Sequence, residues 1–309
     1  MQPDKKLITI KDNKKLISDF IYDMIIRPRQ NAHKWSATTN QTPNLKTGYP
    51  SQHLASLITG MKGTASGARG NDICDGSEVK ACSKVDQSDK CQSCKNNVLR
   101  TDKVCPYCGS DKIKRNNDSK WLISVRSKDE LRMLLEETPR FVFLVTDYPN
   151  FDKDDYNDIR IRAFEVWMKS DRARNYRELL DNYYNYIYLP HIKANPNQTP
   201  APKNLFPDNF PFYMCNPIKT FECIIKDSLT EKAKLDITHY VEPDVDRSDL
   251  ASELMPASLL SKPERNVLLA ANVGFTDKTE FVTEDMRKAL SLRDTDKAIK
   301  TIGTKQHKF

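Results

Sequence analysis

Two cysteine pairs constrain the fold of this chain more than any other feature of its sequence. Each pair has the spacing C-x2-C, and the pairs are Cys91 with Cys94 and Cys105 with Cys108. Two such pairs can place four thiolates tetrahedrally around one Zn²⁺, and a site of four thiolates leaves no position open for a substrate. We therefore predict a structural zinc ribbon, inserted in the chain over residues 86–118.

The ribbon also carries basic residues that could contact phosphates, namely Lys90, Lys95, Arg100, Lys103, Lys112, Lys114 and Arg115. A purely structural ribbon is an equally good interpretation of the same pattern. The remaining cysteines have no ligand spacing, and we expect them to be small buried residues: Cys74, Cys82, Cys215 and Cys223.

The composition is that of a soluble globular chain. Its 309 residues are 38% hydrophobic and 29% charged, which allows two domains or one large domain with insertions. No stretch approaches the roughly 18 apolar residues that span a membrane, and the polar stretch 1–15 is not a secretory signal. We therefore expect a cytoplasmic protein.

The net charge of +7 weakly favours a polyanionic partner, and the lack of a P-loop argues against a nucleotide cofactor.

A second motif combines two acids and an amine, Asp72 followed by Glu78 and Lys80. Magnesium prefers hard oxygen ligands, here the carboxylates of Asp72 and Glu78 with the carbonyl of Val79 as a further ligand. Lys80 follows Glu78 by two residues and therefore lies on the same face of a strand. Its amine could hold the attacking water and stabilise charge on a phosphate. The motif predicts magnesium-dependent phosphodiester hydrolysis, although a polar surface hairpin would also show it.

The turn at Asp75-Gly76 decides whether the two acids can meet. In a two-residue turn, Asp72 would lie opposite Val79 and point away from Glu78. In a three-residue turn over 74–76, with Gly76 in the left-handed region, Asp72 would pair with Glu78. The hydrolase interpretation requires the second arrangement, and Asp75 is the alternative carboxylate.

Periodicity predicts an α/β fold around this motif. A helix over Pro50–Gly60 precedes the hairpin, whose strands we expect at 71–74 and 77–82. Beyond the ribbon, a strand at Trp121–Val125 leads to a helix over Leu131–Glu137 that begins with a capping box. An apolar strand at 141–146 follows, and this strand-helix-strand unit favours a parallel pair in a mixed sheet.

Elsewhere the pattern predicts four further elements and a loop. We expect a helix over Asn13–Ile26 that ends at Pro28, a polar loop over 27–48 that could lie on DNA, and an aromatic helix over Ile161–Tyr188. Strands are expected at Phe212–Ile225 and Ala233–His239. These elements divide the chain into a core over 1–190, a strand-containing extension over 191–247 and a mainly helical part over 248–309.

The C-terminal part has three short helix candidates, at Lys262–Ala271, Thr283–Leu290 and Thr295–Ile302. The last two could form a helix-turn-helix in which Lys297 and Lys300 face DNA. A small helical subdomain without a DNA-binding role would look the same.

Residues 50–80 resemble the core of PD-(D/E)xK nucleases, in which a helix precedes a hairpin that carries Asp and then Glu-x-Lys. The short gap between the acids is similar to that of the mismatch-repair nicking enzyme MutH. The whole chain resembles type II restriction endonucleases, among them the MamI-like group. The resemblance implies a mixed sheet with helices on both sides and cleavage of double-stranded DNA by Asp72, Glu78 and Lys80. Because cutting both strands needs two sites, it also implies a homodimer.

The chain departs from the nuclease pattern at two places. Asn71 stands where many members have proline, at a position without a chemical role. The helix over 50–60 has no Glu, whereas several relatives use an additional acid there, so that Gln52 or His53 would face the site instead. The number of bound magnesium ions therefore stays open.

Two other functions fit part of the sequence. A non-catalytic zinc-ribbon DNA-binding regulator would keep the ribbon, the charge and the helical end. A repair nuclease of the same fold would keep the acids and the amine but nick DNA or recognise damage.

Overall fold

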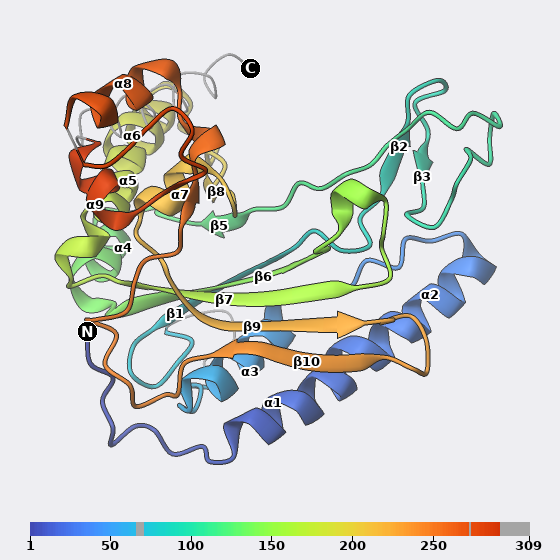
Figure 1. The fold of residues 1–309 in the computed structure, drawn as a ribbon, viewed down its shortest axis with the longest axis horizontal. Coiled ribbons are helices and arrows are strands. Elements are labelled where there is room, and N and C mark those ends of the chain that lie inside the picture. The colour runs from blue at the N-terminus through green and yellow to red at the C-terminus, as the bar shows by residue number, and fades with distance from the viewer. Residues whose placement is uncertain (66–70, 272, 291–309) are drawn as a thin grey trace.

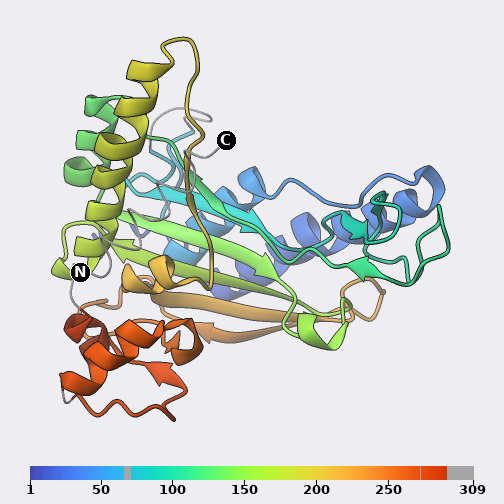
Figure 2. The same cartoon turned by 90° about the horizontal axis from the view of Figure 1, so that it is seen from above.

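The computed structural model describes residues 1–65, 71–271 and 273–290. The fold is built around one mixed sheet (Figures 1 and 2). Its five strands lie in the order β1-β6-β7-β9-β10. The strand β1 runs parallel to β6, and the other neighbours are antiparallel. The bounds are β1 Glu78–Ser83, β6 Arg140–Asp147, β7 Ile159–Trp167, β9 Ile218–Lys226 and β10 Lys234–Tyr240. The predicted α/β class with a mixed central sheet is confirmed.

Both faces of this sheet are covered, as the central strand β6 shows. Its alternate side chains Phe141, Phe143 and Val145 pack into one hydrophobic core. The intervening Val142 and Leu144 pack into a second core on the opposite face. Since successive side chains of a strand point to opposite faces, an uninterrupted apolar run indicates a strand buried on both sides.

One face is covered by helices α1 (Asn13–Ile21), α2 (Arg27–Thr39) and α3 (Gly48–Thr59). The helix does not end at Pro28 as predicted, because the π-helical turn η1 (Tyr22–Ile26) joins α1 to α2. In this turn the Arg27 N–H donates to the Tyr22 carbonyl, five residues back. Such widening leaves room for a proline ring that would otherwise collide with the preceding turn. The predicted polar loop over 27–48 is therefore largely helix.

The opposite face carries α4 (Lys128–Arg132), α5 (Arg174–Tyr183), α6 (Leu189–Ala194), α7 (Phe210–Met214) and the connecting turns η2 (Met133–Glu137), η4 (Asp171–Ala173) and η5 (Tyr184–Tyr188). A single helix over Ile161–Tyr188 was a wrong prediction, because its first part is strand β7. The segment 159–163 alternates apolar and basic residues, which is a strand period. Likewise, the first part of the predicted strand Phe212–Ile225 is helix α7.

The parallel pair exists, but with a different partner from the one predicted. The strand β5 (Trp121–Ile123) pairs antiparallel with β8 (Lys203–Leu205) in a separate two-stranded sheet. The parallel neighbour of β6 is β1, with Glu78 opposite Phe141 and Ser83 opposite Thr146. The inserted cysteine ribbon and β5 both lie in the crossover between these two strands.

The inserted ribbon is a small sheet of β2 (Asp89–Cys91), β3 (Asn97–Val98) and β4 (Ile113–Lys114) in the order β3-β2-β4. It lies beyond one end of the central sheet, next to α2 (Figure 1). The turn η3 (Phe151–Lys153), between β6 and β7, lies at this same end.

The C-terminal part contains β11 (Met255–Pro256), η6 (Ala257–Leu259), α8 (Lys262–Ala270), β12 (Phe281–Val282) and α9 (Glu284–Ala289). Met255, Leu268 and Met286 pack it against the core. The first two predicted C-terminal helices are confirmed, whereas the third, Thr295–Ile302 with Lys297 and Lys300, lies outside the described residues. Within the described ranges, no helix is both long and apolar enough to cross a membrane.

Candidate active site and metal centre

The predicted strand over 71–74 is absent, since Ile73 makes only an isolated bridge with Gly63, but the hairpin turn before β1 has the three residues that the hydrolase interpretation requires. The Ile73 N–H donates to the Ser77 carbonyl at 3.2 Å, and the Gly76 N–H donates to the Ile73 carbonyl at 2.9 Å. Gly76 has a φ of +91°, in the region that favours glycine. The extra residue of this turn brings Asp72 to the start of β1 rather than to the far side of the hairpin.

The carboxylate of Asp72 accepts two hydrogen bonds at the start of β1. The backbone N–H of Val79 donates to Oδ2 at 2.7 Å, and the side-chain amide of Gln52 donates to Oδ1 at 2.6 Å. Gln52 lies on α3, whose C-terminal end is set by Gly60 in the left-handed conformation. Of the two helix residues considered in the sequence, Gln52 contacts the acid, whereas His53 is exposed.

Glu78 and Lys80 lie side by side on the same face of β1. The Lys80 Nζ donates to Glu78 Oε1 at 2.5 Å. The Glu78 side chain is 19% exposed and that of Lys80 is 24% exposed, so both groups are partly open to solvent. The structure therefore brings the three predicted residues and Gln52 together at the beginning of one strand.

Burial raises the pKa of both carboxyl groups. For Asp72, the Val79 hydrogen bond and the Lys80 charge oppose this rise without cancelling it. For Glu78, burial is again the largest cause, Lys80 lowers the pKa, and the charge of Asp72 raises it further. The two half-buried carboxylates repel each other, and the single positive charge of Lys80 does not balance their two negative charges. A divalent cation would supply that charge, so the donor set fits a hard metal ion.

Asp75, the alternative carboxylate, has another role in the hairpin. Its Oδ2 lies 3.1 Å from Nη2 of the buried Arg140, and its Oδ1 accepts the Ser77 N–H. Arg140 also donates to the Ser77 hydroxyl at 2.9 Å and to Glu165 at 3.0 Å. Asp75 thus ties the turn to β6 and β7 through Arg140. The role of this arginine leaves no signal in the sequence, because its partners are distant in the chain.

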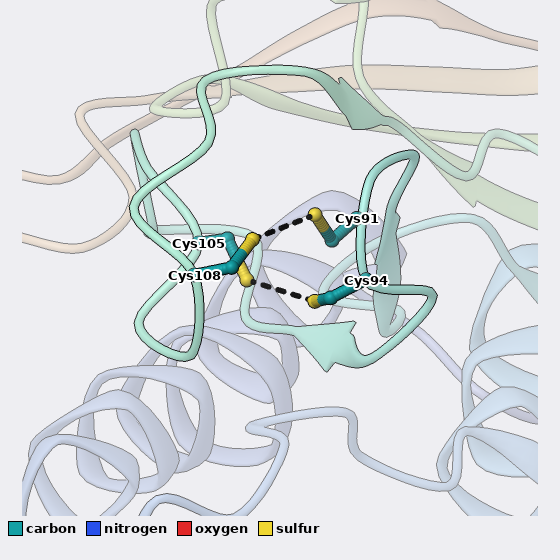
Figure 3. A group of neighbouring side chains, drawn as sticks. All are labelled: Cys91, Cys94, Cys105 and Cys108. Carbon is teal, nitrogen blue, oxygen red and sulfur yellow. Dashed lines mark hydrogen bonds between the residues drawn. The ribbon is translucent and has the colours of Figure 1, made fainter.

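The four ribbon cysteines form a group that could hold one metal ion (Figure 3). Their sulfur atoms all lie within 4.8 Å of one another, with 3.7 Å between Cys91 and Cys108 and 3.5 Å between Cys94 and Cys105. Tetrahedral Zn²⁺ with sulfur bonds of about 2.3 Å needs sulfur separations of about 3.8 Å. The spacing of the thiols therefore fits zinc.

Each cysteine pair is followed directly by a residue with positive φ, +65° at Lys95 and +71° at Gly109. The N–H groups of these residues donate to the carbonyls of Cys91 and Cys105, which closes both knuckles. The neighbouring thiols raise the pKa of the Cys108 thiol to about 11, whereas the backbone N–H groups of Cys94 and Ser93 lower that of the Cys91 thiol to about 6. The lowered pKa of Cys91 favours the thiolate form that metals bind.

Comparison with known proteins identifies the family. A family model described as MamI restriction endonuclease matches residues 34–258, which include the hairpin, the ribbon and the whole central sheet. The chain belongs to the MamI restriction endonuclease family. It is also similar to the Type II restriction enzyme MamI of Microbacterium ammoniaphilum, with 32% identity over 75 residues, which are 24% of this chain and 24% of that enzyme. No solved structure matches the chain.

In this MamI-family chain, both ribbon arginines form ion pairs that stabilise the fold. Arg100 and Arg115 both pair with the buried Asp89, at 3.0 and 2.8 Å. The Arg100 guanidinium also lies 4.8 Å from the ring centre of Tyr156 and 5.5 Å from that of Tyr148, in the β6–β7 connection. The prediction that Arg100 contacts phosphates is wrong, because this side chain is 2% exposed.

Three of the four cysteines outside the ribbon are buried, as predicted. Cys82, Cys215 and Cys223 are buried, and burial raises the pKa of all three thiols, that of Cys82 to about 12. Cys74 is exposed, against the prediction, because it lies in the turn that places Asp72.

Proposed function

We propose that this MamI-family chain is a type II restriction endonuclease that cleaves double-stranded DNA at a specific sequence by magnesium-dependent hydrolysis. The observation that carries the proposal is the convergence of Asp72, Glu78 and Lys80 at the start of β1. These residues lie inside the region that the family model matches. As a restriction enzyme it would act in the cytoplasm of a prokaryotic cell.

The residues that would hold Mg²⁺ are Asp72, Glu78 and the carbonyl of Val79. The Val79 N–H faces Asp72, and the N–H and C=O of one strand residue point to the same edge of the strand. When bound, the cation would neutralise charge on the phosphate and lower the pKa of a bound water. Four cysteines, Cys91, Cys94, Cys105 and Cys108, would hold a structural Zn²⁺.

Lys80 is the residue that acts on the reacting atoms. Its ammonium group lies beside Glu78 and can donate a hydrogen bond to the attacking water or to a phosphate oxygen. The water oxygen forms a bond to phosphorus and gives up one proton, the bond from phosphorus to the leaving oxygen breaks, and that oxygen takes up a proton, so the net change is the addition of one water. Negative charge grows on the non-bridging oxygens during this step, and a fixed cation such as Lys80 stabilises it.

Gln52 holds Asp72 in place for this chemistry. Its amide donates to one carboxylate oxygen while the Val79 N–H donates to the other, so the orientation of the carboxylate is fixed before DNA binds. A fixed ligand loses little conformational entropy when the cation arrives. We therefore assign Gln52 as a positioning residue rather than a ligand.

One hairpin of this kind cuts one strand, so cleavage of a duplex requires two copies of the site. We propose a homodimer in which each protomer cleaves one strand, since a two-fold axis matches the symmetry of a palindromic duplex.

The test is digestion of undamaged plasmid DNA by the purified protein in Mg²⁺, with Lys80→Ala as the variant. We expect discrete fragments from the wild type and a loss of about a hundredfold or more in the variant, the scale seen when one charge-stabilising group is removed. DNA binding, measured in Ca²⁺, should survive in the variant. Binding by the wild type without any cleavage would favour a non-catalytic regulator. Nicks without a fragment pattern would favour a repair nuclease.

A further inference from the structure

The zinc ribbon presents a row of side chains on its outer face. In the register of the ribbon sheet, Lys90 on β2 lies opposite Lys114 on β4 and opposite Asn97 on β3. Directly opposed residues point to the same side of a sheet, so these three side chains share one face. All three are exposed, whereas the next pair, Cys91 and Ile113, packs into the interior of the ribbon. We call Lys90, Asn97 and Lys114 the ribbon lysine row.

None of the five acids of the ribbon, Asp86, Asp89, Asp102, Asp111 and Asp118, forms an ion pair with this row among the described residues. Asp89 is buried between Arg100 and Arg115, and Asp86 pairs with Arg29 of α2. Five exposed lysines remain without an ion pair among the described residues: Lys90, Lys95, Lys103, Lys112 and Lys114. Like charges directly opposite each other destabilise a sheet. A polyanionic partner would offset that cost.

The row lies at the end of the sheet away from the candidate active site. The strand β1 starts at Glu78 and runs toward the ribbon, which lies beyond Ser83 (Figure 1). The five steps from Glu78 to Ser83 span about 17 Å at roughly 3.3 Å per residue. The ribbon therefore cannot reach the cleaved phosphate, and any DNA that it contacts lies farther along the duplex.

The ribbon is also held firmly against the core. Arg100 packs over the aromatic rings of the β6–β7 connection, and Thr42 donates to the Asp86 carbonyl at the entrance to the ribbon. Asp86 itself forms a 2.6 Å ion pair with Arg29 and accepts a hydrogen bond from the Tyr148 hydroxyl. A charged surface on a fixed support contacts a duplex at a fixed distance from the active site.

We propose that the ribbon lysine row binds the phosphate backbone of the DNA duplex outside the cleaved sequence, on the flank toward which β1 points. This inference rests on the proposed nuclease function and adds a second DNA contact to it. At about 3.4 Å per base pair along each strand, the contact lies at least about five base pairs from the cleaved phosphate. Lysine contacts to phosphate carry no sequence information, so the flank contributes affinity and not specificity.

The test compares DNA binding in Ca²⁺ for two duplexes, one with short flanks of the cleaved sequence and one with long flanks. The variant is Lys90→Gln/Lys114→Gln. For the long duplex we expect weaker binding and a slope of log affinity against log salt that is smaller by about 2, since each phosphate contact contributes about 0.9. For the short duplex the variant should bind like the wild type. Zinc content equal to that of the wild type shows that the ribbon is intact.

A matched control is available on the central sheet. Lys226 and Lys234 are also exposed and directly opposed, on β9 and β10 at the far edge from β1. The variant Lys226→Gln/Lys234→Gln removes the same charge and should still bind the long duplex more tightly than the short one. Equal losses in both double variants, or a loss that does not depend on flank length, would overturn the proposal.

Failure of the row and failure of the nuclease function give different results. A wild type that cleaves DNA but binds both duplexes equally would refute only the proposal that the ribbon lysine row binds flanking DNA. A wild type that gains affinity from long flanks, loses it in Lys90→Gln/Lys114→Gln, and never cleaves would refute the nuclease function alone.

Discussion

Gly76 controls whether Asp72 reaches Glu78, because the left-handed backbone at this residue creates the three-residue turn. A Cβ atom there would lie 3.2 Å from Cδ of Pro139, in addition to the strain of a φ of +91°. Gly76→Ala should therefore cost about 1–3 kcal/mol of stability and move Asp72 out of position, so that cleavage falls more than stability alone explains. Chemical denaturation and cleavage rates measure the two effects.

Gly274→Ala is the control for this substitution. Gly274 has a φ of +76°, but nothing lies within 4 Å of its added Cβ, and it belongs to the C-terminal part. It should lose stability without a specific loss of cleavage. If Gly76→Ala cleaves DNA at the wild-type rate, the turn does not position the acid.

The raised pKa values of Asp72 and Glu78 predict how metal binding depends on pH. Because burial raises both, each carboxyl keeps its proton up to a higher pH than an exposed carboxyl does. Protons compete with the cation, so Ca²⁺ or Mn²⁺ affinity should already fall at a pH above the usual carboxyl range. The stability of the metal-free protein depends on pH in the opposite direction. The folded state binds these two protons more tightly than the unfolded chain does, so the free energy of unfolding rises as the pH falls through the raised pKa values.

Titration calorimetry of Mn²⁺ between neutral and mildly acidic pH checks this dependence, with Glu78→Gln as the comparison. The variant should lose most of the affinity and its change with pH. An affinity in the wild type that stays constant down to the range of an exposed carboxyl would contradict the assignment of these two ligands.

Among the elements, the ribbon is the one that we expect to depend on a metal for its folding. Its interior consists of little more than Cys91, Val98 and Cys105 with Cys94 and Ile113 packed against them, too small a core to fold alone. Protein purified without added metal should contain one Zn²⁺ per chain, measured by elemental analysis. A strong chelator should make residues 86–118 sensitive to protease while the central sheet stays folded. Protease resistance after complete loss of zinc would contradict a structural role.

The sequence predicted elements whose signals are local and missed those set by distant contacts. The N-cap at Ser127 and the apolar strand β6 were identified because both depend on neighbouring residues, although the Glu130 carboxylate accepts from the Arg126 N–H and so does not complete the predicted capping box. The helix across Pro28 was missed, since the π-helical turn that accommodates it leaves no mark in the sequence. β7 was assigned to a helix because its aromatic and apolar residues continue into the helical segment after it.

For the molecule as a whole, the site was more predictable than the sheet that supports it. Asp72, Glu78 and Lys80 are neighbours in the sequence, so a turn and a strand suffice to bring them together. The pairing of β1 with β6 and the buried network of Arg140, Glu165 and Arg247 join residues far apart in the chain. Spacing and periodicity carry no information on such contacts.

The central claim is that Asp72 and Glu78, and not Asp75, form the catalytic carboxylate pair. The most direct measurement is the single-turnover rate of cleavage of one duplex in Mg²⁺ by Asp72→Asn, Glu78→Gln and Asp75→Asn, each with its melting temperature. We predict losses of about a hundredfold or more in the first two at nearly unchanged stability. Asp75→Asn should melt at a lower temperature, since it weakens the contact with Arg140, yet cleave within about threefold of the wild type while folded. Cleavage that survives in Asp72→Asn or Glu78→Gln would contradict the account.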